Sequence, residues 1–84
     1  MKRNREAIIS QILSICMDGA IKTRVVYKAN LNFKTVEPYL ELLVKNKLLK
    51  VQPGKRTFYE TTKKGENLLK AMENVNRVIG FRSL

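Results

Sequence analysis

Apolar side chains recur with the period of an α-helix in the N-terminal part of the chain. Asn4, a good N-cap residue, precedes this pattern, and Gly19, which readily takes the left-handed conformation of a helix end, follows it. The stripe consists of Ile8, Ile9, Ile12, Leu13, Ile15 and Cys16. The pattern predicts a first helix from about Arg5 to Asp18 that packs on more than one neighbour.

A short second helix and a tight turn are expected next. Thr23 would cap this helix, which would end near Ala29 and bury its two valines. In the turn Asn30-Leu31-Asn32, both asparagines can take uncommon backbone angles or hydrogen-bond locally, and Leu31 would fill the core. Helix, turn and helix at this spacing predict a helix-turn-helix.

Pro38 decides where the third helix should begin. With Asn32 as the N-cap, Pro38 would remove an internal hydrogen bond, whereas with Thr35 as the N-cap it falls in the first turn, where no N–H is needed. We therefore expect Thr35 to cap the helix, residues 33–34 to form an irregular turn and Asn46 to end it. The inward side chains would be Val36, Tyr39, Leu40, Leu43 and Val44.

A β-hairpin and a long helix complete the pattern. The strands are expected at Leu48–Val51 and Thr57–Thr61, joined by a type II turn with Pro53-Gly54 at its centre. Thr62 would cap a helix from Lys63 to Ile79. The apolar stripe of this helix is Leu68, Leu69, Ala71, Met72, Val75, Val78 and Ile79, and Gly80 before Phe81 resembles a Schellman ending.

The order helix, helix, helix, two-stranded wing and long C-terminal helix predicts a winged helix-turn-helix, an α+β fold that is mostly α. A chain of 84 residues is too short for two cores, so residues 1–84 are expected to form one domain. The second half of the last helix has little to pack on in a monomer. We expect residues 63–79 to be a dimerisation element that joins a homodimer through Met72, Val75, Val78 and Ile79. The alternative is that this stripe folds back on the first helix.

Composition excludes several functional classes. The chain has one cysteine, Cys16, and no histidine, so it lacks an internal disulfide, the usual zinc ligands and the commonest general base. We expect Cys16 to be buried, no cofactor to be bound and the protein not to be an enzyme. No apolar run approaches the roughly 20 residues of a membrane span, and the N-terminus has no apolar signal region. A cytoplasmic, nucleoid-associated location is expected.

Charge favours a polyanionic partner. Seventeen Lys and Arg oppose seven Asp and Glu, which gives a formal net charge of +10 and a pI near 10.1. The alternative is that the lysines serve only solubility. Basic and polar residues lie on the elements that contact DNA in winged helices, which favours nucleic acid. The candidate DNA-binding residues are Lys22, Arg24, Lys28, Lys34, Thr35, Lys45, Lys55 and Arg56.

Two further sets of residues refine this hypothesis. Glu37 and Glu41 on the third helix either accept hydrogen bonds from cytosine or, more simply, pair with Lys34 and Lys45 on the same helix. The simpler reading favours backbone contacts with modest sequence discrimination. The aromatic residues either stack on bases or pack in the core and wing, and we expect packing for all except Phe58, which strand alternation directs outward. They are Tyr27, Phe33, Phe58 and Tyr59.

Three segments together resemble a family of small archaeal winged-helix DNA-binding proteins, whose best-known Sulfolobus members are dimers joined by a long antiparallel coiled coil. They are KTRVVYKANLN at 22–32, YLELL at 39–43 and YETTKKGENLL at 59–69. The resemblance implies an archaeal or archaeal-virus source, sequence-tolerant or regulatory DNA binding and no cofactor. The sequence departs from this family soon after Gly80, where it stops, so we expect no long coiled coil.

The resulting hypothesis is double-stranded DNA binding by a small archaeal transcriptional regulator or nucleoid-associated protein. Phosphate contacts would come from the second helix, the start of the third helix and the wing. A winged-helix protein-protein interaction module and an RNA-binding protein are the alternatives, because a fold alone does not fix a function.

Overall fold

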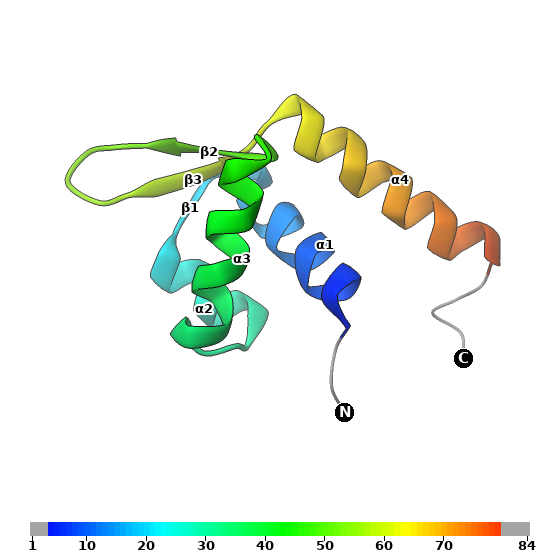
Figure 1. Ribbon diagram of the computed structural model, residues 1–84, viewed down its shortest axis with the longest axis horizontal. Helices are drawn as coiled ribbons and strands as arrows, with labels where there is room; N and C mark the ends of the chain where they lie inside the picture. Colours follow the sequence, from blue (N-terminus) through cyan, green and yellow to red (C-terminus); the bar gives the residue numbers. More distant parts are fainter. Residues whose placement is uncertain (1–3, 80–84) are drawn as a thin grey trace.

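The computed structural model describes residues 4–79, with side chains up to residue 75, as four α-helices and a three-stranded antiparallel sheet of order β1-β3-β2 (Figure 1). The wing and α4 lie at opposite ends of the molecule, with the other helices between them. The order of the four helices and of the hairpin is the predicted one, whereas the strand β1 was not predicted. The elements are α1 (Arg5–Ile15), the 3₁₀ turn η1 (Cys16–Asp18), β1 (Ala20–Ile21), α2 (Lys22–Ala29), α3 (Phe33–Lys45), β2 (Leu49–Gln52), β3 (Phe58–Thr61) and α4 (Lys63–Ile79).

The first helix begins at the predicted residue, but its last turn is a 3₁₀ turn and Gly19, with a ψ of 142°, does not take the predicted left-handed helical conformation. Asn4 is the N-cap, and its side chain accepts a 2.7 Å hydrogen bond from the Ala7 N–H. The α-helix ends at Ile15 and passes into η1. Gly19 then takes a φ of 84°, and a Cβ at this position would clash with the Phe58 ring. Only glycine therefore fits where the chain leaves η1.

The second helix starts directly from a strand that the sequence did not predict. Ala20 and Ile21 pair with Tyr59 and Phe58 of β3. Ile21 is the N-cap and offers no side-chain hydrogen bond, so the prediction that Thr23 caps α2 is wrong. Pairing with β3 fixes the backbone up to Ile21, and α2 begins directly after it without a capping side chain. A strand of two residues is too short to show an alternating pattern.

The turn between α2 and α3 uses both asparagines, in different ways. Asn30 ends α2 in the left-handed conformation, with a φ of 56°. Asn32 is the N-cap of α3, and its Oδ1 accepts a 2.8 Å hydrogen bond from the Thr35 N–H. The prediction of Thr35 as the cap is therefore wrong. Pro38 lies inside α3 on its exposed face, where water can hydrate the carbonyl that loses its helical partner.

The wing is formed by β2 and β3, which pair from Leu49 opposite Thr61 to Gln52 opposite Phe58. Residues 53–57 form the loop between the strands. Gly54 does not take a positive φ, so the predicted type II turn is wrong. A loop of this length reverses the chain without the left-handed residue that a two-residue turn requires.

The end of α3 is tied to the start of α4. Asn46 is the C-cap of α3, as predicted. The Thr62 Oγ1 accepts a 3.0 Å hydrogen bond from the Gly65 N–H, which confirms Thr62 as a capping residue, and donates a 2.7 Å hydrogen bond to the Lys47 carbonyl. Gly65 is buried, and a Cβ there would clash with the carbonyl oxygen of Leu48.

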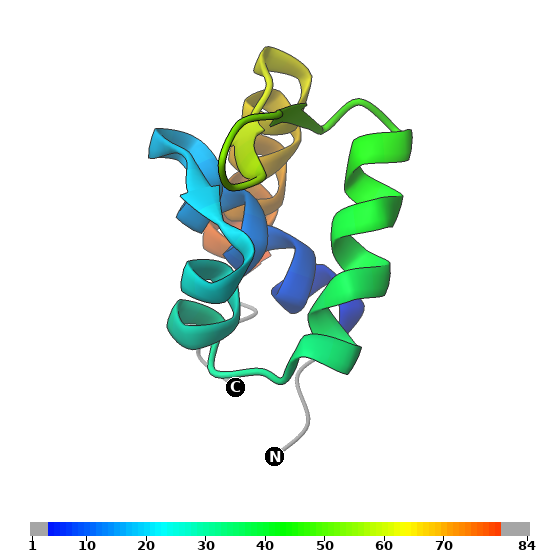
Figure 2. The same cartoon turned by 90° about the vertical axis from the view of Figure 1, so that its left-hand side faces the viewer.

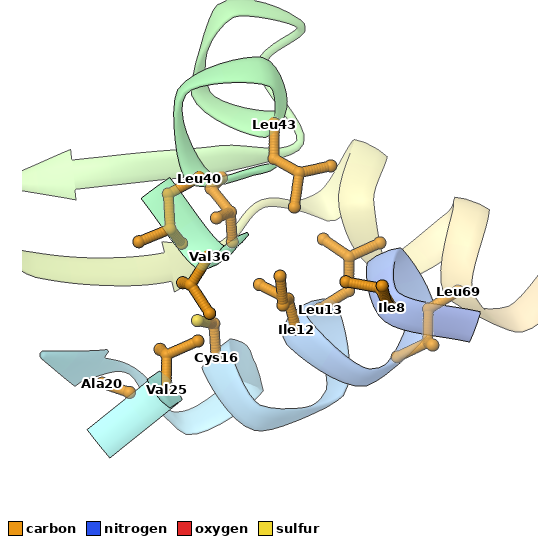
Figure 3. Close-up of a cluster of buried hydrophobic side chains, with 11 residues drawn as sticks. Ile8, Ile12, Leu13, Cys16, Ala20, Val25, Val36, Leu40, Leu43 and Leu69 are labelled. Carbon is orange, nitrogen blue, oxygen red and sulfur yellow. The ribbon is translucent and has the colours of Figure 1, made fainter. Parts of the chain in front are cut away.

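The core lies where α1, α2 and α3 meet the sheet and the first turns of α4 (Figure 3). Cys16 is fully buried, as predicted, and burial raises the pKa of its thiol to about 12. Leu31 packs against this core from the turn. The core residues are Ile8, Ile12, Leu13, Cys16, Ala20, Val25, Val36, Leu40, Leu43, Leu49 and Leu69.

The long helix α4 covers the core with one part of its apolar stripe. Leu69 is buried, whereas Leu68 and Val75 are exposed. The predicted Schellman ending at residues 80–81 lies outside the described residues. Among helices within residues 4–79, none has the length and hydropathy of a membrane span.

Candidate nucleic-acid interface

The second helix, the third helix and the wing lie together at one end of the molecule. Seen from that end, the wing points toward the viewer between α3 on one side and β1 with α2 on the other (Figure 2). Six of the predicted DNA-binding side chains are exposed on these elements, and none makes an ion pair within 4 Å in the described part of the chain. They are Arg24, Lys28, Lys34, Lys45, Lys55 and Arg56.

The other two predicted residues are more restrained. Thr35 is partly buried, and its backbone N–H is taken by the Asn32 side chain. The Lys22 Nζ donates a 2.7 Å hydrogen bond to the Glu37 Oε2 across the α2–α3 boundary. This bond raises the pKa of Lys22, with smaller contributions from the charges of Glu37, Tyr59 and Glu41 and an opposing effect of desolvation. Lys22 therefore already has an anionic partner.

The carboxylates of α3 do not pair as expected. The predicted pairs Lys34–Glu37 and Glu41–Lys45 do not form within 4 Å. Glu37 instead accepts the hydrogen bond from Lys22. Glu41 and Lys45 border a shallow hollow between α3 and the wing. Its apolar lining comes from Leu40, Val44, Val51 and Tyr59. The outward face of α3 thus presents both signs of charge.

The wing separates its charges along its length. At its base, the Lys50 Nζ lies 3.7 Å from the Glu60 Oε1, and the Gln52 amide donates a 2.9 Å hydrogen bond to the same oxygen. In the loop, Lys55 and Arg56 are exposed and have no carboxylate partner among residues 4–79. The tip of the wing is therefore positive, while its base is largely neutralised.

Two of the four aromatic side chains differ from the expectation. Tyr27 is 84% exposed and Phe33 is 47% exposed, so the prediction that they pack in the core or wing is wrong. Tyr59 does pack against the core, and Phe58, at 37% exposed, lies over Gly19. Tyr27 follows Thr23 by four residues on α2, so the polar side of the helical pattern could have indicated its exposure.

One long interval of the sequence contains basic residues but no acidic ones. From Gly19 to Val36 the sequence contains Lys and Arg but neither Asp nor Glu. This interval includes all of α2 and the first turn of α3. Apart from Lys22, which is bonded to Glu37, the basic side chains of this interval make no ion pair within 4 Å in the described residues, and such exposed positive charge attracts anionic groups such as phosphate. In the described chain, by contrast, no group of three or more His, Cys, Asp or Glu residues is arranged to hold a metal ion.

Two archaeal proteins are similar in sequence. The uncharacterized protein MJ0290 of Methanocaldococcus jannaschii is 36% identical over 80 residues, which cover 94% of this chain and 36% of that protein. The uncharacterized protein MJ0287 of the same organism is 33% identical over 82 residues, which cover 96% of this chain and 81% of that protein. The chain thus spans about a third of MJ0290 and most of MJ0287.

Solved structures share the fold. Sso10a-2, a DNA-binding protein from Sulfolobus solfataricus, matches with a TM-score of 0.87 and 30% identity over 96% of this chain and 86% of that chain. BpsR of Bordetella bronchiseptica, whose DNA binding is regulated by 6-hydroxynicotinic acid, matches with a TM-score of 0.79 and 23% identity over 90% of this chain and 58% of that chain. The family model of the winged helix-turn-helix matches residues 2–80. With a match over almost its whole length, the chain belongs to the winged helix-turn-helix family.

Proposed function

We propose that the chain binds double-stranded DNA as a small archaeal transcriptional regulator or nucleoid-associated protein in the cytoplasm. The observation that carries this proposal is the set of exposed basic side chains, without carboxylate partners in the described chain, on α2, the start of α3 and the wing loop. Winged helices contact DNA through these same elements. The similarity to Sso10a-2, a DNA-binding protein, supports the proposal.

The proposed contacts are mainly to phosphates. Arg24, Lys28 and Lys34 would act beside the major groove, and Lys55 and Arg56 would follow the backbone from the wing. Lys45 and Thr35 complete the proposed set, whereas Lys22, which the sequence also predicted, is bonded to Glu37. Glu41, which is exposed on α3 and has no ion pair within 4 Å in residues 4–79, opposes phosphate contacts there, and binding that rests mainly on phosphates should discriminate only modestly between sequences.

Removing charge from the wing loop tests this proposal. Duplex binding by the wild type should weaken steeply with salt, and Lys55→Ala or Arg56→Ala should each flatten the log–log salt dependence by about 0.9, because one phosphate contact is lost. The affinity loss should be similar for different DNA sequences. Fluorescence anisotropy with two unrelated duplexes at several salt concentrations measures both quantities.

A matched control lies in the same hairpin. Lys50 is already paired with Glu60, so Lys50→Ala should change the salt dependence less than either loop variant. Absence of duplex binding by the wild type at low salt would refute the proposed function. Preference for RNA over duplex DNA in a competition titration would favour an RNA-binding role, and co-purification of a stoichiometric protein without DNA affinity would favour an interaction module.

We also propose a homodimer through α4. Val75 is 50% exposed and Leu68 is exposed in the single chain, and Met72 lies between them on the same helix. Val78 and Ile79, whose side chains are not described, would extend the same stripe. A second copy would cover such a stripe and remove apolar surface from water.

Introducing a charge into this stripe should dissociate the dimer. Val75→Glu places a carboxylate in the proposed interface and should shift sedimentation from dimer toward monomer. Asn74→Glu adds the same charge at the preceding exposed position of α4 and should leave the dimer intact. A wild type that sediments as a monomer, or equal effects of the two variants, would refute the dimer without affecting the DNA-binding proposal.

A further inference from the structure

Lys22 and Glu37 join the two helices of the helix-turn-helix. Lys22 is the first residue of α2, and Glu37 lies on the exposed side of α3. Their 2.7 Å contact has the length of a charge-assisted hydrogen bond, and the two side chains remain 33% and 54% exposed. The pair therefore lies at the surface that faces a nucleic acid in the proposed function.

Lys22 faces more than one carboxylate. Glu41 follows Glu37 by one helical turn, and its charge also raises the pKa of Lys22. A phosphate that approached Lys22 would therefore enter a site where one carboxylate is already bound and a second is near. Lys34, on the same helix, has no ion pair within 4 Å in the described chain and offers its charge without such competition.

We propose that Glu37 is an internal competitor for DNA phosphate: by holding Lys22, it withdraws one cation from the phosphate contacts and limits non-specific affinity. This inference rests on the proposed duplex binding. Glu37 accepts from one of the three Nζ–H donors of Lys22 and offsets its charge, so the contact that a phosphate gains there is reduced by the carboxylate that it must displace or approach. A repulsive element of this kind lowers affinity for every sequence that does not compensate it, which is a recognised way to build specificity.

A charge-balanced set of variants tests the proposal. Glu37→Gln frees Lys22, so the log–log salt dependence of duplex binding should become steeper by about 0.9. Its affinity advantage over the wild type should then fall about 3.5-fold when salt rises fourfold, from about 50 to about 200 mM. The double variant Lys22→Gln with Glu37→Gln removes both partners and leaves the net charge unchanged. It should return to the wild-type salt slope.

Glu41→Gln is the matched control. This variant removes the same charge one helical turn away from Glu37. Glu41 itself forms no ion pair with Lys22 within 4 Å. The variant should raise affinity through reduced repulsion but leave the salt slope near that of the wild type. Circular dichroism of each variant checks that the fold is kept, as expected for partly exposed side chains.

Each other result overturns the proposal. An unchanged slope in Glu37→Gln, or an equal steepening in Glu41→Gln, means that Glu37 does not compete specifically. A double variant whose slope is flatter than the wild type by about 0.9 means that Lys22 already contacts a phosphate. Salt-dependent duplex binding by the wild type is measured first, so failure of the proposed function is seen separately from failure of this inference.

Discussion

The wing loop and the helix pair α2–α3 both carry positive charge, and the structure restrains them differently. In the loop, Lys55 and Arg56 are exposed on a segment of residues 53–57 that lies beyond the paired part of the hairpin. In the helix pair, α3 is capped by Asn32 and bridged to α2 through Lys22 and Glu37. The wing loop therefore presents its positive charges without carboxylate partners in the described chain. In the helix pair, the charges are held in place and the charge of Lys22 is offset by Glu37.

This difference separates two tasks of a nucleic-acid surface. Free lysines and arginines on a loop can reach phosphates at slightly different positions, which suits contacts that do not depend on sequence. A helix held by a cap and a cross-helix bond presents its side chains in one register, which any reading of base edges requires. The exposed carboxylates of α3 weaken the attraction of this helix to phosphates.

Two glycines provide the strongest way to break this comparison. Gly65 lies against the Leu48 carbonyl, at the joint between α3, β2 and α4, so Gly65→Ala must displace backbone and should lower the free energy of unfolding by about 3 kcal/mol. Gly54 lies in the wing loop, where the nearest atom to an added Cβ is the Arg56 carbonyl oxygen at 3.8 Å. Gly54→Ala should change stability by less than about 0.5 kcal/mol. Urea denaturation followed by circular dichroism measures both.

The two glycine variants compare how firmly the joint and the wing loop are held. If Gly65→Ala is as mild as Gly54→Ala, then the joint between α3, β2 and α4 is as adaptable as the loop, and the C-terminal end of α3 is held no more firmly than the wing. If Gly54→Ala is as damaging as Gly65→Ala, the loop is held by contacts that its exposure does not reveal.

The sequence predicts those features that local chemistry determines. Asn4, Asn46 and Thr62 each end or begin a helix with their own hydrogen bonds, and such positions are readable from residue type and spacing. The burial of Cys16 follows from helical periodicity in the same way.

The features that the sequence did not predict depend on contacts between distant segments. The strand Ala20–Ile21 exists because β3 is beside it, and two residues carry no pattern of their own. Glu37 pairs with Lys22, fifteen positions away, instead of with Lys34, because the crossing of α2 and α3 brings the two side chains together. Tertiary packing decides each of these outcomes.

The start of α3 gives a smaller test, which sharpens the comparison on its helical side. Asn32→Ala removes the side-chain acceptor of the Thr35 N–H and should lower the free energy of unfolding by about 1 kcal/mol. Thr35→Ala is the control, because the Thr35 hydroxyl caps nothing when α3 begins at Phe33, and should cost less than about 0.5 kcal/mol. Thermal and urea unfolding of both variants measure the difference. A larger loss in Thr35→Ala would place the cap at Thr35 after all, with Pro38 in the first turn, and would mean that the segment carrying Lys34 is irregular and as loosely held as the wing loop.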